Sequence, residues 1–139
     1  MKLPINIFNL LNNKVNNERI IFENSYFIVI EDLNHKEDNY HYCAWCKNDI
    51  RNLLEVTGKT ISKIIDIKNN LILKNIIKDD GYIFIHFPPN VWRLHIHFVS
   101  KDHFFKAQEY EIFHLDEIVK NIKNNESYYI NNVIIRNKL

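Results

Sequence analysis

Residues 93–99, RLHIHFV, carry the side chains best suited to chemistry, because an arginine and two histidines alternate there with apolar residues. Side chains alternate across a strand, so Arg93, His95 and His97 share one face, with about 7 Å along each step of two residues. Arginine binds oxyanions as a fork, and an imidazole can donate, accept or attack. The spacing therefore indicates a row of side chains that can hold a phosphate chain.

The same alternation predicts a core face and leaves two other interpretations of the histidines open. Leu94, Ile96 and Phe98 fall on the opposite face, which is a good core face. His95 and His97 can instead belong to a solvated sheet face with no chemical role. They can also chelate zinc, but the third ligand would have to come from elsewhere, since no cysteine or carboxylate lies near in sequence.

The elements that must position this strand are predicted from hydrophobic periodicity and turn residues. We expect helices at 4–14, about 58–77, 114–125 and 127–138, and strands at 19–24, 25–32, 40–47, 82–87 and 92–99. Thr57 is the expected N-cap of the long helix, and the four-residue loop PPNV joins the last two strands as a hairpin. Residues 33–39 and 100–111 are predicted as loops. The mixed order, with hairpins and one long central helix, predicts the α+β class.

Length and composition restrict the class of protein. A chain of 139 residues with 46% hydrophobic residues suits a single packed domain over 1–139, in which 1–18 form an N-terminal helix and linker. The net charge of +1 argues against binding of long nucleic acid through bulk charge, whereas a small nucleotide needs only a local cluster. No stretch reaches the roughly 20 apolar residues that span a bilayer, so no membrane partner is expected. We expect a cytoplasmic protein with reduced cysteines, with the nucleus as the alternative compartment.

Two further motifs are set aside. CAWC matches the C-x-x-C pattern, but Cys43 and Cys46 are three apart on a predicted strand and so point to opposite faces. This predicts two packed thiols in place of a redox or zinc pair. TGKT resembles the end of a phosphate-binding loop, but Leu53 stands where that loop requires a glycine.

An ordered set of stretches resembles the histidine-triad superfamily, and most closely its scavenger decapping enzymes, which are cap-dinucleotide diphosphatases. The stretches are IFNLL, RIIFEN, EDLN, IRNL, YIFIHFPPNVWRLHIHF and HLDEIVKNI followed by YY. They follow the family's order with similar spacings and cover nearly the whole chain. The resemblance implies a histidine-triad fold, with an antiparallel sheet, a long central helix and C-terminal helices. It also implies a homodimer and a reaction that needs no metal or other cofactor.

The resemblance implies hydrolysis of the triphosphate bridge of a methylated cap dinucleotide or another dinucleoside polyphosphate. His95 corresponds to the middle histidine of the triad, which attacks phosphorus and forms a covalent nucleotidyl-histidine. His97 corresponds to the last, which contacts the phosphates and helps the leaving group. A neutral imidazole is a usable nucleophile if its far nitrogen keeps its proton on a fixed acceptor, such as a backbone carbonyl.

The resemblance also implies substrate-binding residues outside this strand. His86 matches a family histidine that can face the phosphates, with a structural histidine near the sheet edge as the alternative. Asn90 stands where the family has a small hydroxyl residue that contacts phosphate, and Asp32 matches a carboxylate that reads the guanine edge. Lys36 lies close to the position of a family lysine, which Asn34 occupies here.

The chain departs from the family's pattern at further points. Arg93 replaces the first triad histidine, Asn6 lies near the position of the tryptophan that stacks on the base, and the family's N-terminal lid domain has no counterpart. Residues that could replace the stacking tryptophan are Trp45, Tyr42 and Trp92. Two hypotheses therefore stand: a metal-independent hydrolase, or a nucleotide-binding or structural protein that has lost turnover.

Overall fold

The computed structural model describes residues 4–14, 18–31, 39–89, 91, 93–101 and 112–131. Its elements in chain order are α1 (Ile5–Leu11), β1 (Ile20–Glu23), β2 (Phe27–Glu31), β3 (His41–Cys46), η1 (Leu53–Glu55), α2 (Gly58–Leu73), β4 (Tyr82–His86), β5 (His95–Val99), β6 (Ile112–His114), α3 (Leu115–Asn124) and α4 (Tyr128–Asn131). The strands form one antiparallel sheet in the order β1-β2-β3-β5-β4-β6. This architecture confirms the predicted α+β class and antiparallel sheet.

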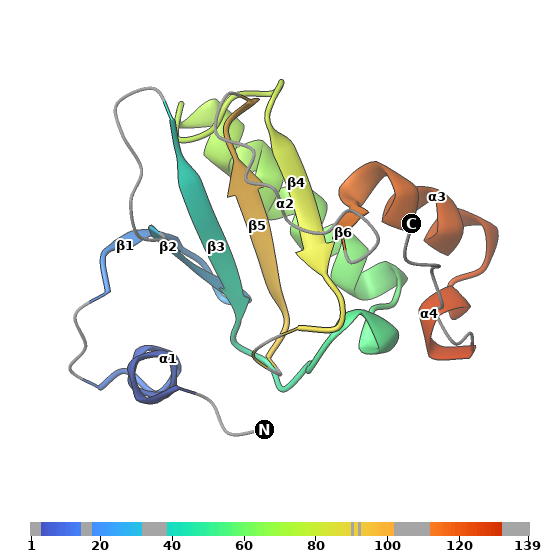
Figure 1. Ribbon diagram of the computed structural model, residues 1–139, viewed down its shortest axis with the longest axis horizontal. Coiled ribbons are helices and arrows are strands. Elements are labelled where there is room, and N and C mark those ends of the chain that lie inside the picture. Colours follow the sequence, from blue (N-terminus) through green and yellow to red (C-terminus); the bar gives the residue numbers. More distant parts are fainter. Residues whose placement is uncertain are drawn as a thin grey trace.

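Helices pack on both faces of this sheet. The long helix α2 crosses one face (Figure 1), and its buried isoleucines and leucine form the main core with alternate residues of β2, β3, β4 and β5. Leu94, Ile96 and Phe98 are at most 2% exposed in this core, which confirms the core face predicted for their strand. The short helix α1 lies on the opposite face, where Ile7 and Leu10 pack on residues of β2 and β3.

The long helix ends four residues before its predicted boundary. Asn75 adopts a φ of 57°, and its N–H donates to the carbonyl of Ile72 at 3.0 Å. The N–H of Ile76 donates to the carbonyl of Leu71 at 2.9 Å. This pair of bonds closes a helix with a left-handed residue, and asparagine tolerates that conformation better than most residues. The apolar spacing continues past this point, so periodicity alone placed the end too late.

Strands β4 and β5 pair as the predicted hairpin, but their connection is longer than the expected four residues. β4 ends at His86 and β5 begins at His95. Just before β5, the N–H of Leu94 donates to the carbonyl of Ile50 at 2.7 Å, so the chain pairs there with another segment. The segment 112–114 was not predicted as a strand, yet it pairs with β4 at the sheet edge as β6. A three-residue strand is too short to give a periodic signal.

Other predicted elements lie only partly within the described residues. The C-terminal helix α4 covers the start of the predicted helix at 127–138, and residues 132–138 lie outside the described part. Most of the predicted loops at 33–39 and 100–111 lie outside it as well. The remaining predicted helices and strands are confirmed, with boundaries that differ by a few residues.

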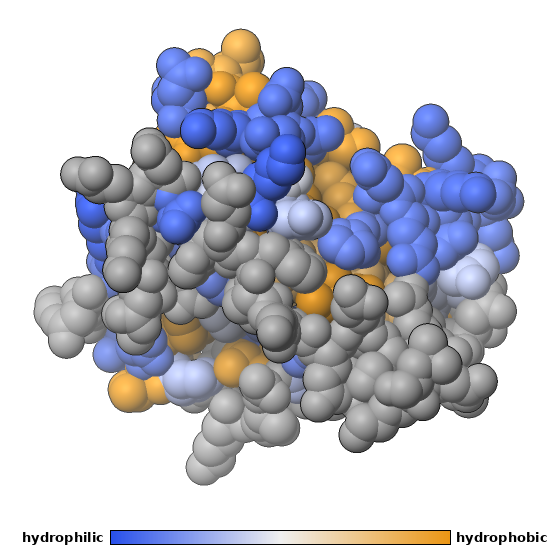
Figure 2. All heavy atoms as spheres, turned by 45° about the horizontal axis from the view of Figure 1, so that its top comes forward, coloured by the Kyte–Doolittle hydropathy of each residue, from blue (hydrophilic) through white to orange (hydrophobic). Residues whose placement is uncertain are grey.

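The surface in view is mixed in polarity. Figure 2 shows hydrophilic residues over much of the coloured surface, with smaller hydrophobic areas between them. In the described part of the chain, the large hydrophobic residues that are exposed come from several elements; they are Ile5, Phe8, Ile20, Leu73 and Ile130. Scattered exposure of this kind is ordinary for a folded domain. Among the described helices, none combines the length and apolar character that a membrane span requires.

Candidate functional site

Among the described residues, five histidines share the sheet face opposite α2, which we call the histidine face. Cys43 of β3 and Phe84 of β4 are both cross-strand partners of His97, and Phe84 is also the partner of His114 on β6. Cross-strand partners point to the same face, and so do residues two apart on a strand. The histidines of this face are His41, His86, His95, His97 and His114. The fold thus brings residues from four strands around the predicted histidine row.

His95 is held in its orientation by a hydrogen bond to the backbone and by contacts with neighbouring rings. Its Nδ1 lies 2.8 Å from the carbonyl oxygen of Arg93, and its ring stacks on Trp45 with 4.1 Å between centroids. A carbonyl only accepts, so Nδ1 carries the proton of this bond. In the neutral ring, the lone pair suited to attack is then on Nε2. This is the backbone acceptor that nucleophilic use of His95 requires.

His97 is enclosed by other rings. Its Nδ1 lies 2.9 Å from Nε2 of His41, and Phe84 stacks almost parallel to it with 5.0 Å between centroids. Burial is the main reason that the pKa of His97 lies well below its usual range, and the neighbouring His95, His41 and His86 lower it further. His97 is therefore neutral at pH 7. It can donate a proton from one nitrogen while the other pairs with His41.

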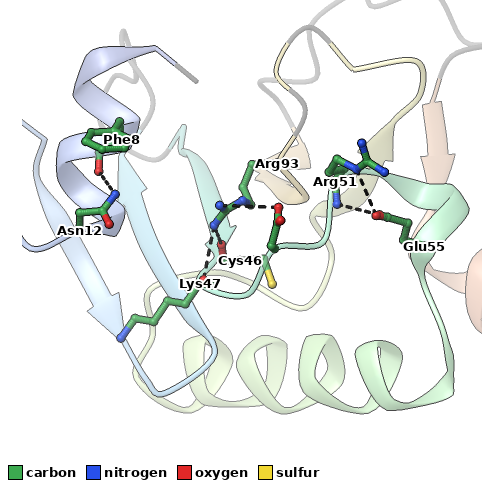
Figure 3. Close-up of polar contacts among 8 residues, drawn as sticks. Phe8, Asn12, Cys46, Lys47, Arg51, Glu55 and Arg93 are labelled. Carbon is green, nitrogen blue, oxygen red and sulfur yellow. Dashed lines mark hydrogen bonds and ion pairs between the residues drawn. The ribbon is translucent and has the colours of Figure 1, made fainter. Parts of the chain in front are cut away.

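The guanidinium of Arg93 contacts the backbone at the end of β3. Its Nη1 donates to the carbonyls of Cys46 at 3.1 Å and Lys47 at 3.4 Å (Figure 3), and its Nη2 lies 3.9 Å from a carboxylate oxygen of Asp49. The side chain is only 16% exposed. Arg93 therefore ties the start of β5 to the end of β3, while its own carbonyl holds His95. The predicted contact of its guanidinium with phosphate stays a prediction.

Replacing Arg93 with methionine is expected to lower the free energy of unfolding by about 1.5–3 kcal/mol, because two carbonyls lose a charged donor. Urea unfolding measures this. Arg51→Met is the matched control, since Arg51 pairs with Glu55 at 3.4 Å on an exposed turn and is expected to cost less than about 0.5 kcal/mol. Equal losses in the two variants would contradict the structural role of Arg93.

Of the other predicted substrate-binding residues, one lies in the described part of the chain and three lie outside it. His86 ends β4 on the histidine face and is half-buried. It is close enough to His97 for its charge to lower the pKa of that ring. Asn90, Asp32 and Lys36 lie outside the described residues, so their predicted contacts stay predictions.

Two residues that could replace the stacking tryptophan, Trp45 and Tyr42, lie in the described part of the chain. Neither offers an accessible ring on which a base could stack. Trp45 is 6% exposed, because it lies between His95 and the apolar side of α1. Tyr42 is on the α2 side of the sheet, where it stacks on Tyr40. Trp92 lies outside the described residues. Asn6, which was predicted to lie near the position of the family's stacking tryptophan, donates from its side-chain amide to the carboxylate of Glu18.

Residues of β3 complete the site; His41 and Cys43 were missed as site residues in the sequence, and Trp45 was considered only as a possible platform for a base. His41, Cys43 and Trp45 alternate along β3 and all reach the histidine face. Their period of two was visible, but the pairing of β3 with β5 was not. The two cysteines are on opposite faces, as predicted: Cys43 packs under α1, Cys46 packs in the main core, and neither is in a disulfide bond.

This sheet, with its long helix and its face of histidines, defines a domain of the histidine-triad type. A solved structure titled "Hit Like Protein" matches 70% of this chain and 99% of its own, with a TM-score of 0.58 and 23% identity. A histidine triad protein from Clostridium difficile matches 77% of this chain and 99% of its own, with a TM-score of 0.58 and 18% identity. At these identities the likeness shows the fold.

The family model described as "Scavenger mRNA decapping enzyme C-term binding" matches residues 6–112. The chain therefore belongs to this family, which confirms the resemblance seen in the sequence. The m7GpppX diphosphatases of Rattus norvegicus and Homo sapiens are similar to it, with 26% and 25% identity over 137 residues. Each match covers 88% of this chain and 41% of the relative, so the chain spans about two fifths of their length.

Proposed function

We propose that this chain hydrolyses nucleoside phosphoanhydrides, with a cap-like dinucleotide or another dinucleoside polyphosphate as substrate and His95 as the nucleophile. The single observation that carries the proposal is the 2.8 Å bond between His95 Nδ1 and the carbonyl of Arg93. It holds the proton on the far nitrogen and directs the reactive lone pair to Nε2. The m7GpppX diphosphatases among the relatives support the choice of substrate class.

The proposed reaction has two displacements at phosphorus. Nε2 of His95 attacks the phosphorus next to one nucleoside, a P–N bond forms, and the P–O bond to the rest of the bridge breaks. The leaving nucleotide departs with the bridging oxygen. Water then attacks the same phosphorus, the P–N bond breaks, and a nucleoside monophosphate leaves with the water oxygen. The water also yields a proton, and His95 returns to its neutral form. Two smaller barriers replace one larger barrier.

His97 supports both steps as a hydrogen-bond donor to the phosphate oxygens in this proposal. When His41 donates from Nε2 to Nδ1 of His97, the proton of His97 is on Nε2 and can reach the substrate. His86 adds a donor from the neighbouring strand. Asn90, Asp32 and Lys36 are proposed to contact phosphate and base.

A second candidate is a protein that binds the nucleotide without turnover. The observation that favours it is the engagement of Arg93, at the position of the first triad histidine, with the carbonyls of Cys46 and Lys47. A guanidinium fixed in this way is a poor replacement for a mobile imidazole. The homodimer and the cytoplasmic location expected from the sequence remain predictions under both candidates.

The proposal is tested by incubating the purified protein with m7GpppG, unmethylated GpppG and diadenosine triphosphate in excess EDTA. Chromatography of the products is expected to show a nucleoside monophosphate from at least one of them. Equilibrium binding is measured beside it. If the protein binds a nucleotide but releases no product, even at a protein concentration equal to that of the substrate, the second candidate is favoured. If the protein neither binds these nucleotides nor releases a product from them, both candidate functions are contradicted.

A further inference from the structure

We propose that His41, Cys43 and His97 form a binding site for a zinc-type ion on the histidine face. The nearest ligand atoms of these residues all lie within 4.8 Å of one another. His41 and Cys43 project from β3, and His97 projects from β5, where it is the direct cross-strand partner of Cys43. The site is therefore built on paired strands, which hold the three side chains in one place.

The two distances from Nδ1 of His97 are close to those of tetrahedral zinc, and the ligand atoms of His41 and Cys43 lie within 4.8 Å of each other. Zinc–nitrogen bonds of about 2.1 Å and zinc–sulfur bonds of about 2.3 Å place two nitrogens about 3.4 Å apart and a nitrogen and a sulfur about 3.6 Å apart. Sγ of Cys43 lies 3.5 Å from Nδ1 of His97, which already fits. Nε2 of His41 lies 2.9 Å from the same Nδ1, so the two rings need to separate by roughly half an ångström.

The donor set selects the kind of ion. One thiolate and two imidazoles suit zinc and related soft or borderline metals, whereas Mg²⁺ and Ca²⁺ require oxygen ligands. His41 and Cys43 are buried, which limits competition from solvent. Three protein ligands and a water make a common zinc shell. On binding, the thiol of Cys43 loses its proton to solvent as the metal–sulfur bond forms.

The site does not depend on the proposed hydrolysis. A zinc ion would take the place of the hydrogen between His41 and His97, since it binds Nε2 of one ring and Nδ1 of the other. His97 would keep its proton on Nε2, the same tautomer that His41 imposes by donating to it. Occupancy is therefore compatible with a phosphate contact from His97 and is not required for attack by His95.

The test uses the full chain after removal of metal with EDTA and dialysis. Titration with Zn²⁺ alone is expected to show one ion per chain with a Kd below about 1 µM. Co²⁺ in its place is expected to give a sulfur-to-metal charge-transfer band in the near ultraviolet. Cys43→Ser should abolish the band and weaken zinc binding at least about tenfold. Cys46→Ser is the matched control, because Cys46 lies on the opposite face of the same strand, and it should retain both.

X-ray absorption of the zinc-loaded wild-type protein provides a second measurement that needs no variant. One sulfur and two imidazole nitrogens around the ion are expected. A site weaker than about 100 µM, a shell without sulfur, or equal zinc affinity in the wild type and Cys43→Ser would overturn the proposal. Hydrolysis assays in EDTA remain separate from this outcome, so the failure of one proposal does not decide the other.

Discussion

Replacing His95 with alanine is expected to lower the rate of nucleotide hydrolysis at least about 10³-fold, because the variant lacks the nucleophile proposed for the first displacement. The fold should survive, since His95 is only half-buried and its ring lies on the histidine face, outside the main core. Initial rates under excess substrate, with far-ultraviolet circular dichroism as the check on folding, measure the effect. Substrate binding should change far less than turnover, because the phosphates contact several other side chains in the proposed site.

His114→Ala is the matched control for that loss. His114 is a histidine of the same face, but it is exposed and contacts the rings of Tyr82 and Phe84 at the β6 edge. Its removal should leave the rate within about twofold, as for a surface substitution. A His95→Ala enzyme that keeps a tenth or more of the wild-type rate would contradict the assignment of His95 as the nucleophile.

Replacing Trp45 with alanine is expected to cost about 3–5 kcal/mol of unfolding free energy, the range for truncation of a large buried aromatic. Trp45 is 6% exposed and packs with Ile7 and Leu10 of α1 on one side and the ring of His95 on another. Its loss would leave a cavity beneath α1 and a loosely held His95. Since domains are stable by only about 5–15 kcal/mol, denaturant unfolding should show a large fall in the midpoint.

Trp45→Phe keeps an aromatic ring but removes the indole N–H, so it separates the packing of the ring from the effect of that N–H. The indole Nε1 is buried and has no hydrogen-bond partner among the described residues. Removing this N–H relieves a cost of about 1–3 kcal/mol, which offsets part of the lost volume. The phenylalanine variant should therefore be at least about 1.5 kcal/mol more stable than the alanine variant. Equal stability of the two variants would show that the ring does not support α1 and His95.

The fold was predictable where the pattern is long and regular. The alternation of Leu94, Ile96 and Phe98 gave the core face of β5, and the apolar stripe of 58–77 gave the central helix. The end of that helix was missed, because the left-handed turn at Asn75 is a local hydrogen-bonding event that hydrophobic spacing does not record. The strand β6 was missed, because three residues carry no period.

The site was predictable along one strand and not between strands. His95 and His97 could be placed on one face from their spacing, and the structure agrees. Their neighbours His41 and Trp45 come from β3, and strand pairing depends on the whole sheet. Arg93 was expected to point at phosphate from its charge and its parity. In the structure β5 begins two residues later, and the guanidinium of Arg93 donates to a backbone carbonyl at the end of β3. Its contact with phosphate stays a prediction.

The central claim is a covalent nucleotidyl-histidine formed on His95, and the stereochemical course at phosphorus tests it most directly. A dinucleoside polyphosphate with a single-configuration phosphorothioate at the attacked phosphorus is hydrolysed in isotopically labelled water, and the configuration of the product is determined. Each in-line displacement inverts phosphorus, so attack by His95 followed by attack of water predicts net retention. Net inversion would show a single displacement by water and contradict the nucleophilic role of His95.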